Sequence, residues 1–194
     1  MDEFAQYEYL TAGKSLHIGQ KLYRSRVTPI GQKKIKWDKM GCPPKELTTA
    51  GRANPIGIPY LYLSDSAKTT YFEVRAVYLD KLSVGTFRIE KDLKLIDFVY
   101  DVNLFLSYND GSVPLKETII KKKVIEAISS DLSKPLRRYD SEIEYVPIQL
   151  ICEYCRRIVD SEGATADGIT FESSLHKGGR NYVLFDESAA KCIR

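Results

Sequence analysis

Short runs in which apolar residues alternate with polar ones predict β-strands along much of the chain. In the first, Gln20–Val27 (QKLYRSRV), Leu22 and Tyr23 stand among basic residues, as in a strand with one face in solvent. Arg24 and Arg26 are two positions apart, so their side chains are expected on the same face. An edge strand protected by its charges is the alternative interpretation. Five more strands are predicted, at Tyr60–Ser64, Ser83–Glu90, Leu93–Phe98, Ile169–Phe171 and Tyr182–Phe185.

Three segments have helical spacing or the residues that begin a helix. Residues 64–66 (SDS) offer capping side chains for a helix that runs through Thr70, Glu73 and Val74. A second helix is predicted over Lys116–Leu132, with one apolar face made of Ile119, Ile120, Val124, Ile128 and Leu132. A third is expected to have Pro147 in its first position and to end near Val159, burying Leu150, Ile151, Tyr154 and Ile158. Strands interleaved with about three helices indicate an α+β fold.

The remaining segments give weaker indications. Residues 1–19 predict only a lead-in or a short helix. Residues 31–50 are polar and rich in lysine, and they predict a long loop with Trp37 as its single large anchor. A loop of that length usually serves as a lid or a partner surface. Residues 109–111 (NDG) predict a loop tip, and residues 177–180 (KGGR) predict a basic loop.

Composition narrows the class of protein. With 194 residues, 43% of them hydrophobic, the chain is long enough for one core, and we expect residues 1–194 to form a single domain. No segment is apolar for long enough to span a bilayer, and the acidic first residues (MDEFAQYEYL) lack a secretion signal, so we expect a cytoplasmic protein with no membrane partner. The net charge is +3 and the basic residues are scattered apart from Lys33–Lys36 and Lys121–Lys123, so direct binding to nucleic acid is not expected.

The 4 cysteines include one CxxC pair, Cys152 and Cys155, while Cys42 and Cys192 lie far away in the sequence. A zinc site needs four ligands, and no second CxxC or HxxxH pair supplies the missing ones. A redox pair of the thioredoxin type would sit at a strand-to-helix turn, whereas this pair falls inside the third predicted helix. We therefore interpret the cysteines as structural thiols, and we expect no metal.

Residues 51–75 (GRANPIGIPYLYLSDSAKTTYFEVR) hold the densest candidate chemistry. The loop that opens this segment is punctuated by glycine and proline and carries Arg52, whose guanidinium suits a phosphate. Glycine lets the backbone of such a loop approach a ligand closely. Glu73, on the helix that follows, is either an exposed surface carboxylate or one aimed into a pocket. The nearby arginine favours the pocket.

This segment resembles the RES domain, named for its Arg, Glu and Ser and found in bacterial toxins that degrade NAD+. The pattern GRANPxGxPYLYLS…T…EVR matches the family, as do YRSR near the N-terminus and DGITFESS…GGRNYVLF near the C-terminus. The resemblance therefore spans nearly the whole chain. It implies a fold similar to that of the ADP-ribosyltransferase toxins, with a split, twisted β core and flanking helices around an NAD+ cleft.

The resemblance also implies roles for individual residues. Arg24 takes the place of the first family arginine, with Arg26 as the alternative if the strand register slips by two. Glu73 takes the place of the helix glutamate, and Ser173 that of the family serine, with Ser174 as a neighbouring candidate. The implied catalytic residues are thus Arg24, Glu73 and Ser173, and the implied NAD+-binding residues are Arg52, Asn54, Tyr62 and Asn181.

These residues imply an NAD+ phosphorylase or glycohydrolase that cleaves the nicotinamide–ribose bond with phosphate or water as acceptor. That cleavage passes through a cation-like sugar, which a carboxylate such as Glu73 stabilises. The chain has no Rossmann GxGxxG motif, so we expect NAD+ as a consumed substrate, inorganic phosphate as a possible co-substrate and no cofactor. The family implies a cognate antitoxin as partner. The alternatives are an ADP-ribosyltransferase that modifies a macromolecule and a catalytically silent NAD-binding module.

Overall fold

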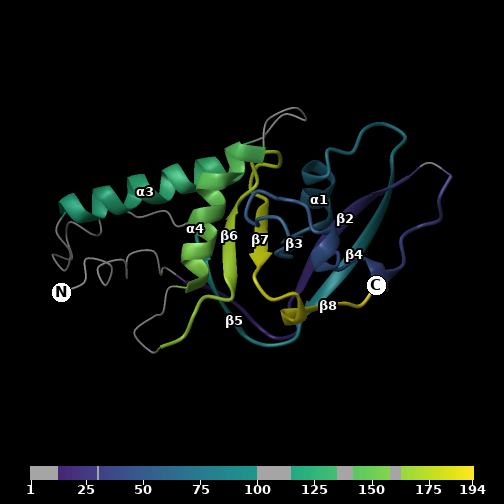
Figure 1. Ribbon diagram of the computed structural model, residues 1–194, viewed down its shortest axis with the longest axis horizontal. Helices are drawn as coiled ribbons and strands as arrows, with labels where there is room; N and C mark the ends of the chain where they lie inside the picture. The colour runs from purple at the N-terminus through teal and green to yellow at the C-terminus, as the bar shows by residue number, and fades with distance from the viewer. Residues whose placement is uncertain (1–12, 30, 100–114, 135–141, 158–162) are drawn as a thin grey trace.

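The chain folds around one mixed β-sheet (Figure 1). The computed structural model describes residues 13–29, 31–99, 115–134, 142–157 and 163–194. Within these residues the strands follow the order β1-β5-β6-β7-β3-β2-β4-β8 across the sheet. Their bounds are β1 (Gly13–Leu16), β2 (Lys21–Thr28), β3 (Leu61–Ser64), β4 (Lys81–Ile89), β5 (Leu93–Asp97), β6 (Gly168–Glu172), β7 (Arg180–Leu184) and β8 (Ala190–Cys192).

The sheet is divided near its centre, between β2 and β3. β2 pairs with β4 along all of Lys21–Thr28, whereas β2 and β3 meet only at Tyr23 and Ser64. Every strand pair is antiparallel except β5 with β6, which is parallel. A single paired position leaves β2 and β3 free to diverge on either side of it. The mixed sheet with flanking helices confirms the predicted α+β fold, and its division matches the split that the family resemblance implies.

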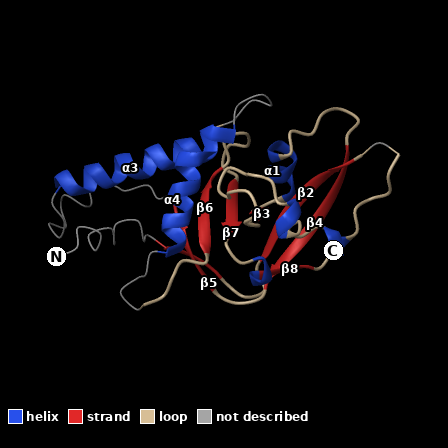
Figure 2. Cartoon of the chain, in the orientation of Figure 1, coloured by secondary structure: helices blue, strands red, loops and turns tan. Residues whose placement is uncertain are grey.

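Three α-helices flank the sheet within the described residues (Figure 2). Helix α1 contacts β2 and β3, at the division of the sheet, whereas α3 and α4 contact β6 and each other. Ser66 caps α1, since its side chain accepts a hydrogen bond from the Thr69 main-chain N–H. The helices and short 3-10 turns are η2 (Trp37–Lys39), η3 (Lys45–Leu47), α1 (Ala67–Glu73), α3 (Leu115–Ser133), η4 (Glu142–Tyr145), α4 (Val146–Arg157) and η5 (Glu187–Ala189).

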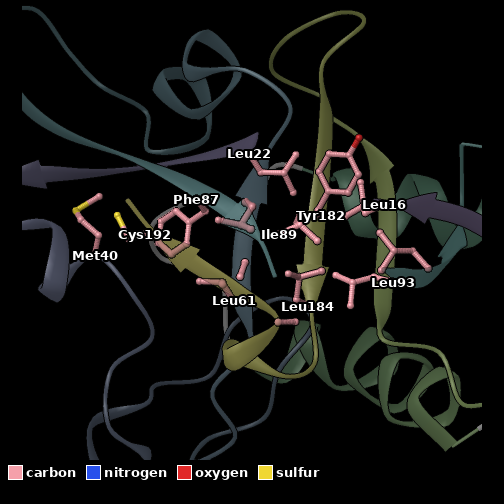
Figure 3. Close-up of a cluster of buried hydrophobic side chains, with 14 residues drawn as sticks. Leu16, Leu22, Met40, Leu61, Phe87, Ile89, Leu93, Tyr182, Leu184 and Cys192 are labelled. Carbon is pink, nitrogen blue, oxygen red and sulfur yellow. The ribbon is translucent and has the colours of Figure 1, made fainter. Parts of the chain in front are cut away.

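Alternate residues of the strands belong to two hydrophobic clusters. Neighbouring residues of a strand point to opposite faces, so Val183 belongs to one cluster and Leu184 to the other. Figure 3 shows the cluster that gathers side chains from every strand except β6, among them Leu22, Leu61, Phe87, Leu93 and Cys192. The other cluster packs the sheet against α3 and α4, through Ile96, Ile169, Leu132 and Ile148. Each fully buried large apolar side chain contributes roughly 1.5–3 kcal/mol.

The predicted buried face of α4 is confirmed at Ile151 and Tyr154, which are partly buried against the core, and is wrong at Leu150. Leu150 is 72% exposed, and the buried residues of the helix are Ile148, Gln149, Cys152 and Cys155. The prediction followed the largest aliphatic side chains, whereas the packed stripe is completed by two cysteines, which behave as small hydrophobic residues. The helix begins at Val146, one residue before Pro147. The expected contact at Ile158 and the expected end near Val159 lie outside the described residues.

Helix α3 forms where the sequence predicts it, and Ile128 and Leu132 of its predicted apolar face are buried, but the rest of the packed face differs. Ile120 and Val124 are exposed, and the buried side chains are Thr118, Ile125, Ile128 and Leu132. Apolar residues occupy more than one side of this helix, so the sequence pattern alone did not single out the packed side.

Two short strands and one anchor were missed. β1 and β8 pair with β5 and β4, but their few residues include lysine and serine and show no clear alternation.

In the loop over residues 31–50, Trp37 is 57% exposed and Met40 is the buried anchor. β2 lies between β3 and β4, so the edge-strand alternative is also wrong. The predicted loop tip at residues 109–111 lies outside the described residues.

Candidate active site

A cavity of about 320 Å³ lies where the sheet divides. Tyr23 and Ser64, the two residues of the single bridge between β2 and β3, both line it. Its other walls come from α1, from the loop before β3 and from the end of α3. Five residues singled out from the sequence line this one cavity, namely Arg24, Arg52, Tyr62, Glu73 and Asn181. Its volume falls at the lower end of the roughly 300–1,000 Å³ that ligand pockets span.

Two hydrogen bonds fix the carboxylate of Glu73, the last residue of α1. Ser173 Oγ donates to Glu73 Oε1 over 2.6 Å, and Asn181 Nδ2 donates to the same oxygen over 2.7 Å. Ser173 is buried and Ser174 is exposed, so the structure brings Ser173, of the two candidates, to the carboxylate. Because both bonds end on Oε1, neither occupies Oε2, the other oxygen of Glu73.

Asn181 is itself oriented by the neighbouring strand. Ser64 Oγ donates to Asn181 Oδ1 over 2.7 Å, and the two residues face each other in the β3–β7 register. Since the amide oxygen is engaged by Ser64, the amide nitrogen faces Glu73. The sequence analysis gave Ser64 only a capping role, because nothing before the strand pairing is known indicates that it lies opposite Asn181.

The loop between β6 and β7 is tied to α1 through His176. The main-chain N–H of His176 donates to Ser173 Oγ over 3.1 Å. The His176 ring stacks on Phe72, with ring centroids 5.1 Å apart and planes 5° from parallel, and its Nδ1 lies 3.0 Å from Thr69 Oγ1. His176 therefore links the serine, through its main-chain N–H, to the helix that carries Glu73, through its ring. The sequence analysis missed His176, which carries no motif of its own.

Arg24 and Arg26 both reach the main-chain oxygen of Gly41. Arg24 Nη1 donates to it over 3.3 Å and Arg26 Nη2 over 2.6 Å, as their shared face on β2 predicts. Only Arg24 lines the cavity. Burial lowers the pKa of the Arg24 guanidinium, and the charge of Arg26 lowers it further. An arginine stays protonated in proteins, so Arg24 brings a positive charge to the wall of the cavity.

Arg52 brings a second positive charge from the loop before β3. Its guanidinium donates to the main-chain oxygen of Leu132, near the C-terminal end of α3, where helix carbonyls carry partial negative charge. Burial lowers the pKa of Arg52, while the negative charge of Glu73 acts to raise it. Two guanidinium groups and one carboxylate that are distant in sequence thus meet around one cavity.

Tyr62 holds the loop that carries Arg52. Its hydroxyl donates to Asn54 Oδ1 over 2.8 Å and accepts from the Ala53 main-chain N–H over 2.9 Å. Burial raises the pKa of Tyr62 above its ordinary value, so the hydroxyl keeps its proton. Tyr62 lines the cavity, whereas Asn54 is buried and is not among the residues that line it. Asn54 therefore supports the loop from behind.

The same loop is pinned from α4 by Gln149. Its Nε2 donates to the main-chain oxygens of Gly51, over 2.8 Å, and Asn54, over 3.0 Å. Gly51 leaves no room for a side chain, since a Cβ there would lie 2.3 Å from Asn54 Oδ1. The glycine of the GRAN motif is thus required by packing inside the loop, and the loop in turn sets the position of Arg52.

The CxxC pair, Cys152 and Cys155, does not line this cavity. Cys152 and Cys155 are free thiols, fully buried on α4. Burial raises the pKa of both, that of Cys155 to about 12, which fits the structural role predicted for them. In the part of the chain that the structure describes, no group of three or more His, Cys, Asp or Glu side chains is arranged to hold a metal ion. None of the helices described there is long and apolar enough to cross a membrane.

The fold and the cavity together define an α+β protein in which two arginines and a hydrogen-bonded carboxylate surround one pocket. The chain belongs to the RES domain family, whose model matches residues 21–194 and so covers most of the sequence. Membership of this family is consistent with an NAD-processing enzyme. No curated protein and no solved structure gives a significant match.

Proposed function

We propose that this RES-domain protein is a toxin that degrades NAD+ by cleaving the bond between nicotinamide and ribose. The observation that carries the proposal is the single cavity shared by Arg24, Arg52 and Glu73. Its charges complement NAD+, because guanidinium groups suit the pyrophosphate and a carboxylate suits the ribose from which the pyridinium ring departs. The hydrogen bonds from Ser173 and Asn181 hold that carboxylate ready before the substrate binds.

In the proposed reaction, nicotinamide leaves with the electron pair of the carbon–nitrogen bond, and the ribose becomes cation-like. Glu73 stabilises this positive charge and accepts a hydrogen bond from the 2-hydroxyl of the sugar through Oε2. A preorganised group of this kind contributes about 10²–10³ in rate. Water as acceptor gives ADP-ribose and a proton, and inorganic phosphate gives ADP-ribose 1″-phosphate.

Arg24 and Arg52 hold the pyrophosphate in this account. Each guanidinium already donates to a main-chain oxygen, Gly41 for Arg24 and Leu132 for Arg52, so each is partly fixed before binding. A dinucleotide gripped at its centre presents its ribose to Glu73 in one orientation, and such positioning lowers the barrier to the chemical step.

The family resemblance adds a partner and a compartment to the proposal. We expect a cognate antitoxin protein that covers the cavity, and a cytoplasmic site of action, where loss of NAD+ would stop growth. Mixing the toxin with its antitoxin is then expected to suppress nicotinamide release without any change in the toxin itself.

The experiment that tests the proposal incubates purified protein with NAD+, with and without inorganic phosphate. Free nicotinamide and the ribose product are separated by chromatography and identified by mass. The proposal expects nicotinamide release in at least one condition, together with ADP-ribose or its 1″-phosphate in equal amount. No release in either condition would overturn it. In a parallel incubation with NAD+ labelled in its adenosine half, label that becomes bound to protein or nucleic acid would favour the ADP-ribosyltransferase alternative.

A further inference from the structure

A second cavity, of about 310 Å³, adjoins the first on the far side of Arg52. Arg52 and Tyr145 line both cavities, so the two share a wall made of one guanidinium and one aromatic ring. The other lining residues come from the end of α3 and the residue after it, from η4 and from the start of α4: Asp131, Lys134, Glu144, Pro147 and Ile148. The cavities are of nearly equal size, with a positive group between them.

This arrangement matches the shape of a dinucleotide, which has two nucleosides joined through two phosphates. One cavity of about 320 Å³ lies near the lower limit for a single small ligand, so it is small for both halves of NAD+. With the pyrophosphate against Arg52 and the nicotinamide half beside Glu73, the adenosine half would extend into the second cavity.

The lining of the second cavity also suits a purine nucleoside. Tyr145 is half-buried and offers a ring on which a base can stack. Pro147 and the buried Ile148 supply apolar surface. The carboxylates of Asp131 and Glu144 are acceptors for an exocyclic amino group and for ribose hydroxyls.

We infer that the second cavity is the binding site for the adenosine half of the dinucleotide, with Tyr145 as the residue that stacks on the base. This inference rests on the proposed function for the identity of the substrate. It assigns Tyr145, Asp131 and Glu144 to recognition of the adenosine half. Glu73 and the Ser173 that orients it act instead at the nicotinamide–ribose bond.

The test measures binding of ADP and of nicotinamide mononucleotide by calorimetric titration, so it needs no turnover. Tyr145→Ala should weaken ADP binding roughly 5- to 150-fold, the range expected for one base–aromatic stack, and Tyr145→Phe should restore it. Glu144→Trp, a bulky change at an exposed position that lines only the second cavity, should abolish ADP binding and leave that of nicotinamide mononucleotide unchanged. Tyr78→Ala is the matched control, since Tyr78 is 92% exposed and lines neither cavity.

The inference fails if ADP binds no more tightly than inorganic pyrophosphate, or if Tyr145→Ala and Glu144→Trp leave ADP binding unchanged. It also fails if Glu144→Trp weakens the binding of nicotinamide mononucleotide as much as the binding of ADP. These outcomes can be separated from failure of the proposed function. ADP binding that depends on Tyr145, in a protein that releases no nicotinamide from NAD+, would keep the adenosine site and overturn the cleavage reaction.

Discussion

Arg24 and Arg26 stand two residues apart on β2 and donate to the same oxygen of Gly41, yet only Arg24 lines the cavity. The pair is therefore a built-in comparison of an arginine at the site with one beside it. From the sequence, the choice between them depended on the strand register. The pairing of β2 with β4 fixes that register over eight residues, from Lys21 to Thr28.

Arg24→Ala is expected to lower kcat/KM for NAD+ by roughly 10- to 150-fold, because it removes a charge-assisted contact to phosphate worth about 1.5–3 kcal/mol. Arg26→Ala removes the same side chain from the same strand and should stay within about threefold of the unchanged protein. Initial rates of nicotinamide release over a range of NAD+ concentrations measure both values. Equal losses in the two variants would show that Arg24 has no special contact with the substrate.

Ser173 and Ser174 illustrate the same limit of sequence reasoning. The motif covers both residues, and only the structure shows that Ser173 is buried against Glu73 while Ser174 is exposed. The bond from Asn181 to Glu73 was equally out of reach, since it depends on the orientation that Ser64 gives to the amide. Residue types were predictable here, and their contacts were not.

At the scale of elements, the loop before β3 shows how a motif is built by packing. Gly51, Asn54 and Tyr62 interlock so closely that a Cβ on Gly51 would lie 2.3 Å from Asn54 Oδ1 and 2.9 Å from the Tyr62 hydroxyl. Arg52 follows Gly51 directly, so any shift of this loop moves the guanidinium that lines the cavity.

Gly51→Ala is expected to lower the free energy of unfolding by about 1–3 kcal/mol, the usual range for overpacking, and to reduce nicotinamide release in the molecules that remain folded. Gly41→Ala is the matched control, because a Cβ at Gly41 would meet no atom within 4 Å. Urea unfolding followed by circular dichroism measures both variants. A Gly51→Ala protein as stable as the Gly41→Ala protein would contradict the packing described for this loop.

The predicted strands and helices mostly exist, and their packed faces were harder to predict. The sequence gives the position of α4 to within a residue at its start, but not the fact that Cys152 and Cys155 complete its buried stripe while Leu150 faces solvent. Which side of a helix is covered depends on the sheet beneath it. β1 and β8 were missed because short strands at the two ends of the sheet need little alternation of their own.

At the scale of the whole molecule, two buried thiols make the free energy of unfolding depend on pH. Burial raises the pKa of Cys152 and Cys155 from an ordinary 9.0, to about 12 for Cys155. Above about pH 9 the unfolded chain therefore loses these protons while the folded chain keeps them. Stability that is fully present below pH 9 should fall as the pH rises toward 12, by up to about 1.4 kcal/mol per pH unit for each thiol.

This dependence is measurable by urea unfolding at pH 8, 9 and 10. The unchanged protein should lose stability across the series more steeply than a Cys152→Ala, Cys155→Ala double variant, which has no such protons to lose. Activity per folded molecule should be the same in both, because neither thiol lines the cavity. Parallel stability curves would show that these thiols ionise as easily in the folded chain as in the unfolded one.

The most direct measurement for the account as a whole is the rate of nicotinamide release by Glu73→Gln at saturating NAD+. The substitution keeps the size of the side chain and removes its charge, so the account predicts a rate about 10²–10³ lower than that of the unchanged protein. Glu46→Gln, at an exposed glutamate on η3, should leave the rate unchanged. A Glu73→Gln protein that releases nicotinamide as fast as the Glu46→Gln control would contradict the claim that this carboxylate stabilises the cation-like ribose.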